Sequence, residues 1–135
     1  MKKRPKSSVN WERAYDIQVR IADLVSSLNM TWIDNSSIYC FRSKNSQARA
    51  YARIWGLGQI WQQALSQKPS YCIEVLSEKF DSLTEDKQDE VLLHELCHIP
   101  KNFSGSLLPH IRKRGSRNFH DRVHELVTLY KNKKR

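Results

Sequence analysis

The chain has 135 residues, 39% of them hydrophobic and 27% charged, which predicts one globular domain with a single core rather than a disordered chain. It has no long apolar run, and its three cysteines are widely spaced, so we expect no signal peptide, no membrane span and no disulfide framework, and a cytoplasmic monomer. The net charge of +9 comes largely from eight basic residues near the two ends, which predicts basic tails at residues 1–8 and 131–135 around a domain at residues 9–130.

The elements expected before residue 80 are a helix, two strands, a short helix and a third strand. Asn10 is predicted to cap a helix at residues 10–28, where Ile17, Ile21 and Leu24 share one face. The remaining elements are predicted at residues 38–41, 49–55, 60–65 and 71–76. Trp32, Trp55 and Trp61 are expected in the core rather than stacked on nucleic-acid bases.

Residues 94–98 read HELCH, an HExxH motif at the end of a helical apolar run. Thr84, or else Ser82, can cap this helix, and Pro100 marks its end. Residues four apart on a helix project from one face, so His94 and His98 can bind one metal ion, with Glu95 beside them as general base. Cys97 points to another face and is expected to be a packed thiol.

A catalytic zinc ion usually has three protein ligands, so a third ligand is expected downstream. His110, which follows Pro109 in a loop, is the favoured candidate. The alternatives are His120, His124 and Glu125 on a final helix whose apolar face carries Phe119, Val123, Leu126 and Tyr130. The metzincin spacing is excluded because Lys101 and Ser104 stand where that motif needs glycine and histidine.

Five segments resemble a metallopeptidase family of archaea and their phages that is similar to SprT-like zincins. They are residues 49–55 (RAYARIW), 73–81 (IEVLSEKFD), 91–100 (VLLHELCHIP), 103–105 (FSG) and 109–110 (PH). The resemblance implies an α+β zincin-like fold, with helices packed on a short mixed sheet and the motif on a central helix. It also implies that His94, His98 and His110 bind Zn²⁺ and that Glu95 is the catalytic base. Two departures from SprT proteins are Ile111 in place of a glycine and the lack of a CxxC pair.

The sequence thus predicts a zinc metallopeptidase with a polypeptide substrate. The enzyme would be either a general peptidase or one that acts on proteins bound to nucleic acid. The strand before the motif helix is expected at the edge of the cleft, where it could hold an extended peptide. Tyr51, Tyr71, Arg112 and His120 are the candidates for stabilising the oxyanion. The alternative is a non-enzymatic protein, either a nucleic-acid binder that uses the basic tails or an interaction protein stabilised by metal.

Overall fold

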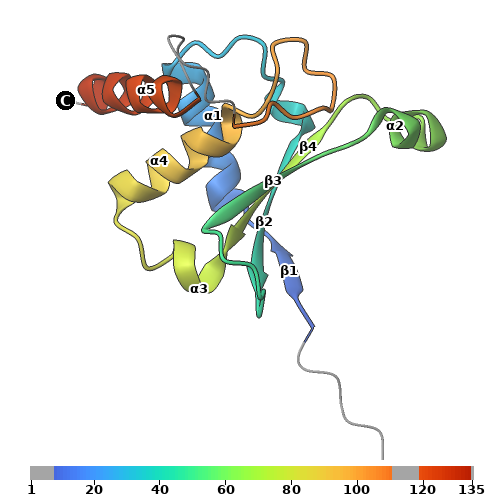
Figure 1. The fold of residues 1–135 in the computed structure, drawn as a ribbon, viewed down its shortest axis with the longest axis horizontal. Helices are drawn as coiled ribbons and strands as arrows, with labels where there is room; N and C mark the ends of the chain where they lie inside the picture. Colours follow the sequence, from blue (N-terminus) through green and yellow to red (C-terminus); the bar gives the residue numbers. More distant parts are fainter. Residues whose placement is uncertain (1–7, 111–118, 135) are drawn as a thin grey trace, which may run out of the picture.

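The computed structural model describes residues 8–110 and 119–134, and in these residues a mixed four-stranded sheet carries five helices (Figure 1). The strands are β1 (Asn10–Arg13), β2 (Ile38–Lys44), β3 (Ala52–Gly56) and β4 (Tyr71–Leu76), in the order β1-β2-β4-β3. The helices are α1 (Tyr15–Ser27), α2 (Gln59–Leu65), α3 (Ser77–Phe80), α4 (Glu85–Leu96) and α5 (Phe119–Lys134). The predicted α+β class is confirmed.

The parallel pair of β2 and β4 forms the centre of the sheet, and β1 and β3 join its two sides as antiparallel strands. Helices α1, α4 and α5 lie together on one side of the sheet (Figure 1). Ile21 of α1, Ile73 of β4 and Leu93 of α4 are each 0% exposed, so the main core lies between these helices and the sheet. This core fixes α4, the helix that carries the motif.

The predicted first helix starts too early. Residues Asn10–Arg13 form β1, which pairs with β2, and the helix begins only at Tyr15. Asn10 is therefore not a cap, and Ala14 takes that position without a side-chain hydrogen bond. The sequence signal was weak because all four residues of β1 are exposed, so neither helical nor strand periodicity distinguishes them. The buried face with Ile17, Ile21 and Leu24 is confirmed.

Two tryptophans predicted in the core lie at the surface. Trp55 at the end of β3 is 51% exposed, and Trp61 on α2 is 59% exposed. Helix α2 projects away from the main body (Figure 1) and none of its residues is buried, so its apolar side chains have no core to enter. Trp32, in contrast, packs against the core as expected.

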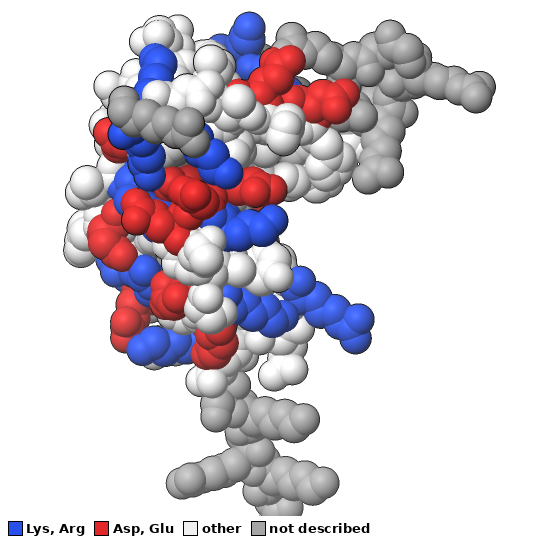
Figure 2. Space-filling model, turned by 90° about the vertical axis from the view of Figure 1, so that its left-hand side faces the viewer, with Lys and Arg blue, Asp and Glu red and all other residues white. Residues whose placement is uncertain are grey.

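Ion pairs connect the three helices that cover the sheet. Asp89 of α4 accepts a hydrogen bond from Arg20 of α1 at 2.6 Å and from Lys134 of α5 at 2.9 Å. Helix α5 extends to Lys134 and so includes most of residues 131–135, which the charge pattern predicts as a tail. Figure 2 shows acidic and basic side chains intermingled on one face of the molecule.

Glu74 of β4 is buried on the other side of the sheet, where it accepts hydrogen bonds from Arg53 at 3.1 Å and from Trp55 at 3.0 Å. Burial raises the pKa of Glu74, but these hydrogen bonds outweigh it and hold the pKa below its ordinary value. The ionised carboxylate therefore stabilises the fold above the pKa of the unfolded chain, and this stabilisation is lost as the pH falls through the lower folded-state pKa.

We expect Glu74→Gln to lower the free energy of unfolding at pH 7 by about 1–3 kcal/mol, because the side chain loses its charge and one of the two oxygens that accept hydrogen bonds from Arg53 and Trp55. Urea unfolding at pH 7 and pH 3 measures this. The difference from wild type should shrink at pH 3, whereas Glu12→Gln on exposed β1 should have little effect at either pH. An equal difference at both values would contradict the role of the charge.

Candidate metal centre

Helix α4 brings the motif to the core. Its N-cap is Thr84, whose side chain accepts a hydrogen bond from the Lys87 amide at 3.3 Å, as predicted. His94 and Glu95 lie in the last turn of the helix, which ends at Leu96. The chain then forms a tighter turn of the 3₁₀ type, in which the His98 amide donates to the Glu95 carbonyl three residues back at 3.1 Å. His98 therefore lies just beyond the helix rather than inside it.

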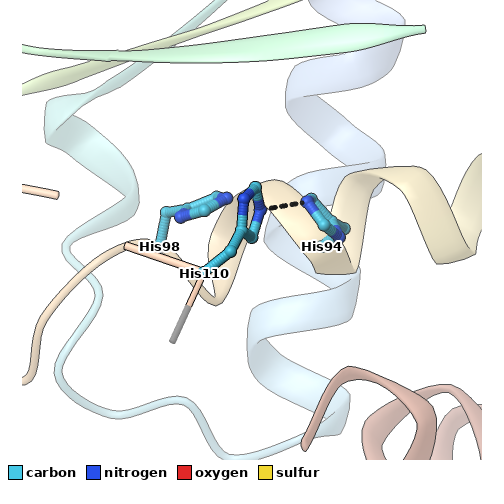
Figure 3. Close-up of side chains that lie close together, drawn as sticks. All are labelled: His94, His98 and His110. Carbon is cyan, nitrogen blue, oxygen red and sulfur yellow. Dashed lines mark hydrogen bonds between the residues drawn. The ribbon is translucent and has the colours of Figure 1, made fainter. Parts of the chain in front are cut away.

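Three histidines converge at this end of α4 (Figure 3). His94, His98 and His110 each offer a ring nitrogen, and these atoms lie within 4.8 Å of one another. The Nε2 atoms of His94 and His110 are 2.9 Å apart. In a tetrahedral zinc site with bonds of about 2.0–2.1 Å, ligand nitrogens lie roughly 3.3 Å apart. The distances among the three histidines bracket that spacing, so the residues present fit a metal ion.

The chemical state of the histidines also fits a metal site. Burial, and after it the charge repulsion of the neighbouring histidines, lowers the pKa of His94 to about 4. Burial likewise lowers the pKa of His98. The His98 Nδ1–H donates to the Leu108 carbonyl, which leaves Nε2 with a free lone pair. Both rings are thus neutral at pH 7, as a ligand must be.

Of the alternative third ligands, none joins this group among the described residues. The ring of His120 lies 6.0 Å from that of His110 and 6.1 Å from that of His94, so it is a neighbour of the trio. His124 and Glu125 lie further along α5. Phe119, expected only as part of an apolar helix face, packs against all three imidazoles, with ring centroids 4.4–4.9 Å apart.

Glu95 is 8% exposed, and burial raises its pKa to about 8. It lines a pocket of about 660 Å³ together with His94, Tyr51, Ala52 and Val123. The pocket lies beside the trio, between α4, the start of β3 and α5. With a pKa of about 8, the carboxyl group of Glu95 can take up and release a proton near neutral pH, which suits proton exchange with a molecule in the pocket. Cys97 is 4% exposed, and burial raises the pKa of its thiol to about 11, so it is the packed thiol that was predicted.

The strand beside the pocket is not the predicted one. β4, which precedes the motif helix, lies inside the sheet, and β3 forms the edge. The order of elements along the chain does not reveal this, because β3 pairs on the outer side of a strand that follows it. The Tyr51 carbonyl and the Leu57 amide form hydrogen bonds with Leu76 and Ser70, at the two ends of β4. Because successive residues of a strand direct their backbone groups to alternate sides, the backbone N–H and C=O groups of Ala52 and Ile54 point to the open edge of the sheet.

The candidates for stabilising the oxyanion differ in whether they can reach a substrate. Tyr71 is 1% exposed and its hydroxyl is engaged by the loop after the motif, so it is not available to a substrate. Tyr51 is 51% exposed and lines the pocket, as does His120. Arg112 and the basic residues that follow it lie outside the described residues.

One of three comparisons with known proteins finds a match. No curated protein and no solved structure matches the chain. The family model described as "Putative phage metallopeptidase" matches residues 9–132, which include the sheet, the motif helix and all three histidines. None of the described helices is long and apolar enough to cross a membrane. With a match over nearly its whole length, the chain belongs to this phage metallopeptidase family.

Proposed function

We propose that this protein is a zinc metallopeptidase in which His94, His98 and His110 hold the ion and Glu95 is the general base. The observation that carries the proposal is the convergence of three imidazole nitrogens within 4.8 Å beside a buried carboxylate and a pocket. Membership of a metallopeptidase family supports a polypeptide substrate. A three-histidine set with no thiolate or carboxylate ligand is typical of catalytic zinc.

When bound, zinc would supply a Lewis acid and lower the pKa of a water molecule to near neutrality. Glu95 would accept a proton from the attacking water and return it to the leaving amine nitrogen. Its buried position keeps the carboxylate away from bulk solvent, and its place next to His94 directs it to the pocket. Tyr51 and His120 are the candidates to donate a hydrogen bond to the oxyanion.

The open edge of β3 would bind the substrate. The outward backbone groups of Ala52 and Ile54 are suited to pair with an extended peptide, as an additional strand of the sheet. Such a peptide would run past Glu95 and the trio, because Ala52 and Glu95 line the same pocket. Recognition through main-chain groups would favour unfolded segments over folded ones.

We expect a chelator to abolish cleavage of an unfolded polypeptide, because removal of the ion leaves the trio without its catalytic centre. Stoichiometric zinc should restore the activity. Gel analysis of a reduced and alkylated protein substrate, with elemental analysis of the enzyme before and after chelation, measures both. Activity that survives complete loss of metal would contradict the proposal. A zinc-loaded protein with no activity would also contradict it, and would instead fit an interaction protein stabilised by metal.

A further inference from the structure

The segment that carries His110 leaves the motif, crosses to the end of the sheet and then returns to the trio. It contains no helix or strand between residues 101 and 110. On its return it contacts His98 twice, since the Leu108 amide donates to the His98 carbonyl at 2.7 Å and the His98 ring donates to the Leu108 carbonyl. The placement of both His98 and His110 therefore depends on where this segment is held.

Tyr71 holds the middle of the segment from inside the sheet. Its hydroxyl accepts a hydrogen bond from the Gly105 amide at 2.8 Å and donates one to the Ser106 carbonyl at 2.8 Å. Its ring, which is 1% exposed, packs edge-on against Phe103 with centroids 4.9 Å apart. One buried side chain thus satisfies two backbone groups that lack partners in regular secondary structure.

Gln62 holds the same stretch from outside. Its side-chain amide donates to the Ser104 carbonyl and to the Leu57 carbonyl, each at 2.8 Å. Gln62 lies on α2, a helix with no buried residue. Through Gln62, a helix that contributes no buried residue to the core connects the end of β3 to the segment that carries His110.

Between these two side chains, the backbones meet without room for a side chain. A Cβ on Gly56 would lie 2.0 Å from the Gly105 carbonyl oxygen, and one on Gly105 would lie 2.3 Å from the Leu57 oxygen. Gly105 also has a φ of +94°, which side-chain-bearing residues rarely adopt. The contact is therefore specific to this loop conformation.

We infer that Tyr71 and Gln62 are positioning residues for the metal site, which fix the segment at residues 103–106 so that His98 and His110 are presented in ligand geometry. This rests on the proposed function. Ordering a loop costs conformational entropy, and a loop already held in place does not incur that cost again when the ion binds. Loss of a group bonded directly to a metal ligand typically lowers metal affinity by about 10–100-fold, and we expect smaller, several-fold losses here because Tyr71 and Gln62 act one step further from the ligands.

The test compares zinc affinity and thermal stability in two single variants and a matched control for each. Tyr71→Phe removes the hydroxyl and keeps the ring, and Gln62→Ala removes the amide from a helix that the core does not need. Tyr130→Phe is the matched control for the first, because it removes a buried hydroxyl that bonds Asp23 far from the trio. Gln63→Ala, one residue along α2, is the control for the second. Competition with a chromophoric chelator gives the zinc affinity, and unfolding with and without zinc gives the stabilisation by the ion.

We expect Tyr71→Phe and Gln62→Ala to weaken zinc binding and reduce the stabilisation by zinc, and both controls to keep wild-type affinity. In a His110→Ala background, Tyr71→Phe should cause a smaller loss than in wild type, because much of its effect acts through that ligand. Equal destabilisation of the metal-free and zinc-loaded forms with unchanged affinity would overturn the inference and leave the proposed function intact. A wild type that binds no zinc would instead refute the proposed function.

Discussion

Replacing Glu95 with glutamine is expected to lower the rate of peptide cleavage by about 10²–10⁴-fold, the usual contribution of a general base. Glutamine has the same shape but cannot accept the proton. The three histidines are unchanged, so the zinc content should stay at the wild-type level. Initial rates on an unfolded polypeptide, together with elemental analysis of each sample, measure the two quantities separately.

A matched control lies on the same helix. Glu85 is in the first turn of α4, far from the trio along the helix, and Glu85→Gln should keep wild-type activity. Equal losses in the two variants would point to general damage to α4. A fully active Glu95→Gln would show that the carboxylate is not the base.

Replacing His110 with alanine is expected to weaken zinc binding by more than about 100-fold, since loss of even an outer partner of a ligand costs 10–100-fold. The remaining histidines, His94 and His98, provide only two of the three nitrogens. Chelator competition gives the affinity. Activity should be lost at zinc concentrations that saturate the wild type.

His120→Ala and His124→Ala are the informative comparisons, because these residues are the alternative ligands from α5. Both should keep wild-type zinc affinity, since neither joins the group of ligand atoms within 4.8 Å. If His110→Ala bound zinc normally and one of these two did not, the third ligand would be on α5.

The motif helix and its apolar face could be predicted because they depend on local spacing. Thr84 caps the helix, and Leu92, Leu93 and Leu96 enter the core, as the helical period requires. The proximity of His110 could be predicted only as one choice among four, because a loop has no periodicity. The structure brings it to His94 through contacts at Gly105 and Leu108.

Other features could not be predicted because they depend on tertiary pairing. The sheet order places β3 at the edge, which no local pattern encodes. The role of Gln62 depends on a partner 42 residues away in the sequence. The sequence predicted Tyr71 as a strand residue and as a candidate oxyanion donor. It does lie in β4, but its hydroxyl binds the loop that carries His110.

The most direct test of a three-histidine metal centre is elemental analysis of the wild-type protein after incubation with zinc and removal of the excess. The convergence of His94, His98 and His110 predicts one tightly held zinc ion per chain, absent from His110→Ala treated in the same way. A folded wild-type protein that retains no zinc would contradict the account.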